Sequence, residues 1–208
     1  MYRCVATSVA GFIQQLAVCY VRHGYWFYVS GEFPAHKVPE KTDRKLIEQY
    51  EIGISKWARA RRKKAGGANL HYLRFDRFYV IIATHGIHPF FEAEAKRLKD
   101  IRETPIQFAG YAIGYRRQHG GACWHPSVRI SMDHYRELKD YFEDIAVHRS
   151  VENLCLEFQA LRLETYAPVR NQLFMILRAI NRRRKAAGFE PVPPSVLRWR
   201  RLSVRTFG

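Results

Sequence analysis

Residues 70–84 read L-H-Y-L-R-F-D-R-F-Y-V-I-I-A-T. The runs 70–75 and 78–84 are rich in aromatic and β-branched residues, and the polar pair Asp76-Arg77 separates them. Two such runs joined by a short polar connection predict a β-hairpin. Because residues 80–83 are all apolar, we expect both faces of the second strand to be buried.

Further strands and several helices are expected on either side of this hairpin. Residues 25–29, Y-W-F-Y-V, have the composition of a central strand, and 106–116 and 125–132 are also predicted to be strands. Helices are expected at 43–50, 91–100, 133–148 and 151–163 and from Pro168 onward, with Thr42 or Asp43 and Asp133 as N-caps. Residues 1–21 fit either a strand followed by a helix or one buried helix. Together these segments predict an α+β fold with a mixed or antiparallel sheet and packed helices.

The length and composition suit one main domain with an appendage. The chain has 208 residues, of which 47% are hydrophobic, enough to bury a core. We expect an α+β core domain over 1–150, a helical appendage over 151–190 with a basic C-terminal helix, and a Pro- and Arg-rich tail over 191–208.

Cysteine spacing and hydropathy bear on the compartment. The four cysteines are scattered and form no C-x-x-C pair, as is typical of reduced thiols. No run of 18 apolar residues occurs, so no membrane partner is expected. We therefore predict a cytoplasmic protein.

A dense basic segment precedes the hairpin. Residues 56–67 read K-W-A-R-A-R-R-K-K-A-G-G, with Ser55 placed to cap a helix and Gly66 or Gly67 placed to end it. Six cations lie within nine residues: Lys56, Arg59, Arg61, Arg62, Lys63 and Lys64. Such a helix repels itself, and a polyanion would relieve the repulsion.

A second basic segment lies late in the chain. An apolar run leads into Arg182, Arg183, Arg184 and Lys185, and the tail adds Arg198, Arg200 and Arg201. The net charge of +16 favours phosphate as the partner, and aromatic residues such as Trp57, Trp199, Tyr72, Tyr111 and Tyr115 could stack on bases. We therefore expect a protein that binds structured RNA or duplex DNA mainly through phosphates. It would be a non-catalytic subunit of a ribonucleoprotein or mobile-element complex, together with other protein subunits.

Catalysis is the alternative hypothesis. His85 and His88 resemble the His-hydrophobic-His pair of nucleases that nick single strands through a tyrosine, although the spacing here is H-G-I-H. Tyr135 or Tyr141 would be the nucleophile. Glu137 and Asp140, together with Asp144, share a helical face suited to Mg²⁺.

No cofactor and no metal ion are predicted. The chain has no phosphate-binding loop, no dinucleotide-binding glycine pattern and no serine-hydrolase motif. Histidine and cysteine spacing matches no zinc signature. Whether the protein is an enzyme stays open at this level.

Overall fold

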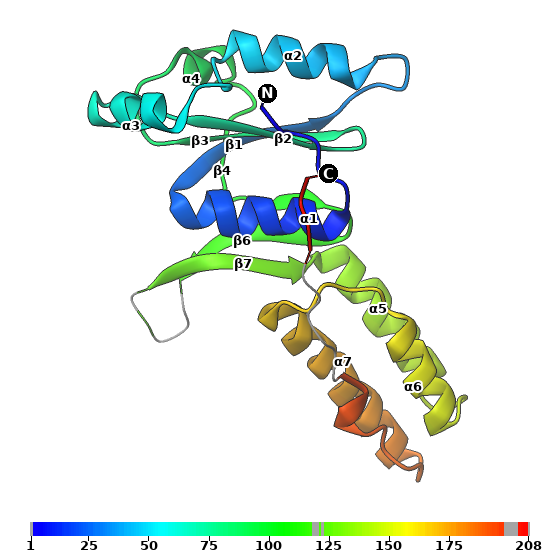
Figure 1. Ribbon diagram of the computed structural model, residues 1–208. Coiled ribbons are helices and arrows are strands. Elements are labelled where there is room, and N and C mark those ends of the chain that lie inside the picture. The colour runs from blue at the N-terminus through cyan, green and yellow to red at the C-terminus, as the bar shows by residue number, and fades with distance from the viewer. Residues whose placement is uncertain (1, 118–120, 122, 198–203, 208) are drawn as a thin grey trace. The chain divides into compact units, whose positions relative to one another are not determined.

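A computed structural model of the protein describes residues 2–117, 121, 123–197 and 204–207 (Figure 1). The chain forms two compact units. The first comprises 1–109, 113–127 and 204–208, and the second comprises 110–112 and 128–203, which includes the whole of the expected helical appendage. Helices combine with antiparallel strand pairs, so the predicted α+β class is confirmed.

The first unit contains a four-stranded sheet with the order β2-β3-β1-β4. Its strands are β1 (Tyr25–Glu32), β2 (Leu70–Phe75), β3 (Phe78–Thr84) and β4 (Lys99–Asp100). The predicted hairpin is confirmed: β2 and β3 pair antiparallel, with Phe75 opposite Phe78 and Asp76 in the left-handed region at φ 51°. Residues 80–83 of β3 are at most 1% exposed, so this strand is buried on both faces as expected.

Helices cover both faces of this sheet (Figure 1). On one face lie α2 (Pro39–Gln49), α3 (Lys56–Lys64) and α4 (Pro89–Ala93). On the other lies a continuous helical segment made of α1 (Val9–Gln14), the π-helical η1 (Gln15–Tyr20) and the 3₁₀ segment η2 (Val21–His23). Both alternatives for 1–21 included a helix, which is found over 9–23; Val5 before it forms a parallel bridge with Arg74, as in the alternative of extended chain followed by helix.

A second sheet has the order β5-β6-β7, with β5 (Ile106–Phe108), β6 (Tyr111–Arg117) and β7 (Trp124–Ile130). The boundary between the two units runs through β6 and β7. The single strand predicted over 106–116 is wrong, because Ala109 and Gly110 both take positive φ and make a turn.

The second unit is built mainly from α5 (Met132–Ile145), α6 (Val151–Ala160), α7 (Ala167–Ala186) and the 3₁₀ segment η3 (Pro194–Leu197). Phe142 of α5 stacks on Phe158 of α6 at 4.2 Å between ring centroids. Leu173, Ile176 and Ile180 of α7 are fully buried. These residues follow a helical spacing of three and four, which is the apolar face that α7 needs for packing.

Three local predictions are wrong. Neither Thr42 nor Asp43 caps α2, because the helix begins at Pro39 after Val38 and Asp43 is buried within it. Ser131, and not Asp133, is the N-cap residue of α5. The helix expected over 91–100 ends at Ala93, since residues 99–100 pair with β1 as β4.

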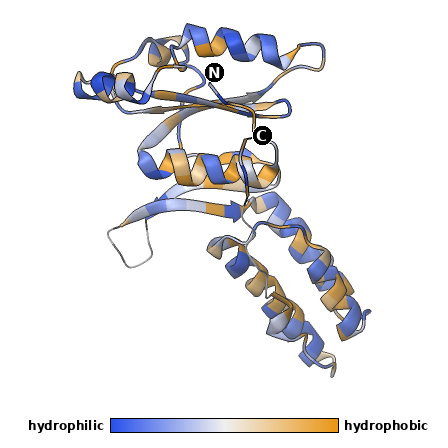
Figure 2. Ribbon diagram, viewed as in Figure 1, coloured by the Kyte–Doolittle hydropathy of each residue, from blue (hydrophilic) through white to orange (hydrophobic). Residues whose placement is uncertain are grey.

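Hydropathy differs between the helices of the first unit. Figure 2 shows α3 as mostly hydrophilic and α1 as rich in hydrophobic residues. None of the helices among the described residues combines the length and apolar content needed to cross a membrane.

Candidate nucleic-acid interface

Local signals set both ends of α3. Ser55 Oγ accepts a hydrogen bond from the Ala58 amide at 3.2 Å, which satisfies one of the free amides of the first turn. At the other end Gly66 takes φ 81°, and its carbonyl accepts from the Ile87 amide at 3.0 Å. The predicted boundaries and cap of this helix are therefore confirmed.

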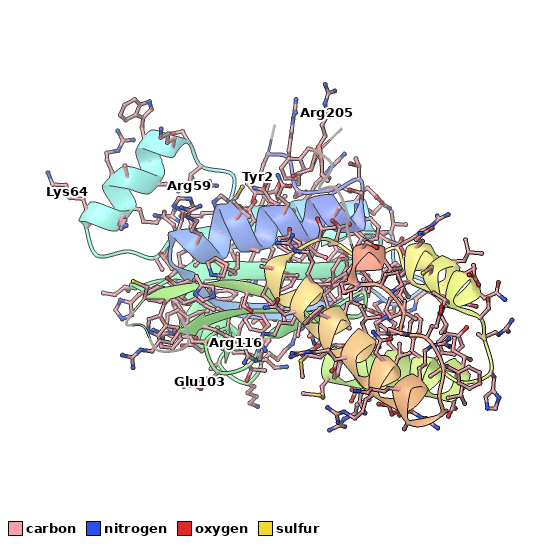
Figure 3. The ribbon with its side chains drawn as sticks, turned by 90° about the horizontal axis from the view of Figure 1, so that it is seen from below. Tyr2, Arg59, Lys64, Glu103, Arg116 and Arg205 are labelled. Atoms are coloured by element: carbon pink, nitrogen blue, oxygen red, sulfur yellow. The ribbon has the colours of Figure 1, made fainter. Side chains whose placement is uncertain are left out.

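The inner face of α3 carries two arginines that bind the protein itself. Arg59 Nη2 donates to the Ile52 carbonyl at 2.6 Å, and Arg59 Nη1 donates to His71 Nε2 at 3.2 Å. Figure 3 shows Arg59 directed toward Tyr2, and its guanidinium lies 5.9 Å from the centre of that ring. Arg62 Nη2 pairs with Glu51 Oε2 at 2.6 Å. Both guanidinium groups therefore fix α3 to the rest of the first unit.

The hydrogen bonds around His71 define its tautomer. Because arginine only donates, Nε2 of His71 must accept, so Nδ1 carries the proton and donates to Tyr2 Oη at 3.1 Å. Tyr2 Oη in turn donates to the Tyr72 carbonyl at 3.0 Å and accepts from the Tyr72 amide at 3.0 Å. Burial, and then the charge of Arg59, lower the pKa of His71 to about 3. The imidazole is neutral at physiological pH.

The outer face of α3 presents the remaining cations to solvent. Lys56, Arg61, Lys63 and Lys64 are exposed, and none of them forms an ion pair within the described residues. Lys64 extends away from the ribbon in Figure 3. Trp57, on the same helix, is 77% exposed, which is unusual for so large an apolar ring. We define these five residues as the outer face of α3.

The basic end of α7 is divided in the same way. Arg182, Arg183 and Lys185 are exposed. Arg184 is 3% exposed, and its guanidinium donates to the carbonyls of Ala146 at 2.6 Å, Arg149 at 2.9 Å and Glu190 at 2.6 Å. Within the second unit, Arg184 thus joins α7 to the end of α5 and to the turn after α7. Its donors are engaged by the protein's own backbone.

The aromatic residues predicted to stack on bases differ in exposure. Tyr72 and Tyr111 are buried, which leaves their rings without a free face for a base. Tyr115 is partly exposed on β6. Arg198, Trp199, Arg200 and Arg201 lie outside the described residues.

The residues of the nuclease alternative are divided between the two units. His88 is the N-cap of α4, where its Nδ1 accepts from the Phe90 amide at 3.1 Å, and His85 is exposed after β3. Burial, and then the charge of Arg62, lower the pKa of His88. Tyr135, Glu137 and Asp140 lie on α5 of the second unit. Within the described ranges, no cluster of three or more His, Cys, Asp or Glu residues is arranged to hold a metal ion.

A cavity of about 410 Å³ lies in the first unit beside α2 and the N-terminal residues. Its lining includes Glu40, Asp43 and Glu48 together with the thiol of Cys4. Burial raises the pKa of that thiol to about 11, so it is neutral at physiological pH. Arg3 and Arg44 also line this cavity, so acidic and basic side chains share it.

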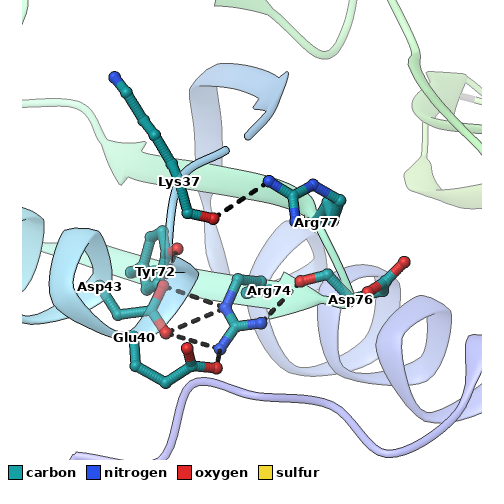
Figure 4. A network of polar contacts seen from close by, with 7 residues as sticks. All are labelled: Lys37, Glu40, Asp43, Tyr72, Arg74, Asp76 and Arg77. Carbon is teal, nitrogen blue, oxygen red and sulfur yellow. Dashed lines mark hydrogen bonds and ion pairs between the residues drawn. The ribbon is translucent and has the colours of Figure 1, made fainter. Parts of the chain in front are cut away.

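Sequence reasoning missed a buried ion pair that holds α2 to the sheet (Figure 4). Arg74 Nε donates to both oxygens of Asp43, at 3.1 and 2.9 Å, and Tyr72 Oη donates to Asp43 Oδ1 at 2.5 Å. Arg74 also pairs with Glu40 at 2.9 Å. An acid in the middle of α2 and an arginine in a half-apolar strand were the available signals, but 31 residues separate them.

Comparison with known proteins found no matching family model, no matching curated protein and no matching solved structure.

Proposed function

We propose that this protein binds nucleic acid through the outer face of α3, chiefly by contacts between its cations and the phosphate backbone. The observation that carries the proposal is the combination on that face of four exposed cations, without carboxylate partners among the described residues, and an exposed tryptophan. Lysine and arginine release counterions from a polyanion, and this release supplies much of the affinity.

The inner face of α3 supports the same proposal indirectly. Arg59 and Arg62 are engaged with Ile52, His71 and Glu51, so they hold the helix in place. An anchored helix presents its outer cations at fixed positions, which reduces the entropy lost on binding. Arg182, Arg183 and Lys185 of α7 are proposed as further phosphate contacts, because they are exposed.

The proposal also covers the complex to which the protein belongs and whether it cleaves nucleic acid. A basic protein with exposed cations suits a subunit of a ribonucleoprotein or mobile-element complex, which we propose to be non-catalytic, with nucleic acid and other protein subunits as partners. Incubation of labelled RNA and single-stranded DNA with Mg²⁺ or Mn²⁺ separates this function from the nuclease alternative, because a binding protein shifts the substrate without cutting it.

The proposal is tested by the salt dependence of binding. We expect affinity for duplex DNA and for structured RNA to fall steeply between about 50 and 200 mM salt. The variant Lys63→Ala/Lys64→Ala should lower the slope of log K against log salt by up to about 0.9 for each lost duplex DNA contact. The matched control is Lys41→Ala/Lys45→Ala, which removes two exposed lysines from α2 of the same unit.

If Lys63→Ala/Lys64→Ala and Lys41→Ala/Lys45→Ala change the slope equally, net charge alone determines the affinity and α3 is not the interface. A flat salt response in the unmodified protein would overturn the proposal altogether.

A further inference from the structure

A row of stacked side chains lies in the first unit. The ring of Trp26 on β1 stacks with Tyr115 on β6 at 5.5 Å between centroids and 29° between planes. Tyr115 stacks in turn with Trp124 at the start of β7, at 5.8 Å and 20°. The guanidinium of Arg102 lies 4.7 Å from the centre of the Trp26 ring. We call these four residues the aromatic ladder.

The ladder is held firmly at the Trp26 end. The Ile101 amide donates to the Trp26 carbonyl at 2.8 Å, and the Tyr115 amide donates to the Ile101 carbonyl at 3.4 Å. Arg102 is itself oriented by Asp100, with Nη2 donating to Oδ2 at 2.5 Å. These contacts fix the backbone at Trp26 and Tyr115 and orient the Arg102 guanidinium beside the Trp26 ring, so this end of the ladder is ordered without a ligand.

The other end of the ladder is open to solvent. Trp124 is 47% exposed, whereas Trp26 and Tyr115 are only partly exposed. An aromatic ring that stacks on one neighbour and is half exposed offers area for one more flat ring. Nucleobases meet this requirement in sequence-tolerant single-strand binding, where they stack on tryptophan and tyrosine.

The charge near Trp124 suits a phosphate backbone. Arg116 and Arg117 at the end of β6 and His125 on β7 are exposed. Side chains alternate along a strand, so Arg117 is on the same face of β6 as Tyr115. Its Nε donates to the Gly121 carbonyl at 2.9 Å, which orients the side chain. Two acids lie beside Arg102 in the sequence. Asp100 forms an ion pair with it, and Glu103 follows it directly.

We infer that Trp124 is a stacking platform for an unpaired nucleobase, so that the first unit binds single-stranded nucleic acid, RNA or DNA, at the ladder. This inference rests on the proposed function and specifies it, because a base inside a duplex cannot reach the ring of Trp124. Phosphates bind on the outer face of α3, and the ladder adds affinity that depends on the base.

The test compares two oligomers of about 15 nucleotides, an oligothymidylate and an abasic strand with the same number of phosphates. We expect the unmodified protein to bind the oligothymidylate about tenfold more tightly than the abasic strand, as one stacked base provides. Trp124→Ala should remove this ratio and leave abasic binding unchanged. Trp124→Phe should restore most of it. Oligouridylate in a parallel experiment distinguishes RNA from DNA.

Tyr141→Ala is the matched control, since Tyr141 is 45% exposed but lies on α5 of the second unit. It should leave the ratio unchanged. Equal binding of both strands by the unmodified protein would overturn the ladder inference while the proposed function survives. If the protein binds none of the four nucleic acids, namely the oligothymidylate, the abasic strand, duplex DNA and structured RNA, both the ladder inference and the proposed function are overturned. Loss of abasic binding in Trp124→Ala would assign Trp124 a structural role and also overturn the inference.

Discussion

The imidazole of His71 lies among Tyr2, Tyr20, Tyr25 and Arg59, and its ring stacks on Tyr20 at 4.2 Å between centroids. The pKa of His71 is about 3 in the folded protein, against about 6.5 in an unfolded chain. Between these values the unfolded chain binds a proton that the folded protein does not. The free energy of unfolding should therefore be intact above about pH 6.5 and fall by up to about 1.4 kcal/mol per pH unit below it.

Urea unfolding at several pH values, from about 7.5 down to 4.5, measures this effect. In His71→Gln the side chain cannot titrate, so the loss of stability toward low pH should be smaller than in the unmodified protein. His36→Gln, which replaces an exposed histidine of the same unit, is the control and should keep the original pH dependence. Identical profiles for the unmodified protein and His71→Gln would contradict this prediction.

The ion pair of Arg74 and Asp43 is almost fully buried, with the two residues 4% and 5% exposed. Asp43→Asn leaves the Arg74 charge without its main partner, and we expect a loss of about 3 to 5 kcal/mol in the free energy of unfolding. The double variant Arg74→Met/Asp43→Leu replaces both charges with apolar groups and should lose less. Chemical denaturation measures both, with Glu48→Gln on the exposed side of α2 as a control that changes stability by at most about 0.5 kcal/mol. A double variant less stable than Asp43→Asn would refute this account of the network.

The basic end of α7 contains one buried arginine, Arg184, among exposed cations. Arg184→Met removes the donor to three carbonyls and should destabilise the second unit by at least about 2 kcal/mol. Arg182→Ala/Arg183→Ala alters only exposed side chains and should change stability by less than about 0.5 kcal/mol each. Thermal unfolding followed by circular dichroism measures these differences.

For binding of nucleic acid, we expect the exposed arginines of α7 to matter more than Arg184. Arg182→Ala/Arg183→Ala should lower the slope of log K against log salt for nucleic-acid binding. Arg184→Lys, which keeps the charge, should leave this slope unchanged. Equal stability of Arg184→Met and the unmodified protein would disprove the structural role of Arg184.

Local patterns predicted many of these elements well, and the reasons are physical. Ser55 caps α3 through a hydrogen bond to a residue only three positions away, and the β2-β3 hairpin joins strands that are consecutive in the chain. The turn at Ala109-Gly110 was missed because apolar residues continue on both sides of it. Likewise, the helical pattern of 91–100 gave no sign that residues 99–100 would pair with β1.

Summed over the chain, positive charge exceeds negative charge, although α5 carries five acids against two basic residues. There are 35 lysines and arginines against 19 acids, and the described ion pairs engage only some of these cations. The α3 cations belong to the first unit and the α7 cations to the second. Each unit thus has exposed cations, which we propose as phosphate contacts, and in the first unit we propose the aromatic ladder as a surface for bases.

The α+β class, the hairpin, the boundaries of α3 and the excess of positive charge could all be predicted from the amino-acid sequence, because they depend on composition and on neighbours within a few residues. Which cations are exposed and which are engaged depends instead on contacts between elements. Arg59, Arg62 and Arg184 look like their neighbours in the sequence, yet their partners come from other elements. The aromatic ladder joins positions 26, 102, 115 and 124, and only folding brings residues so far apart into contact.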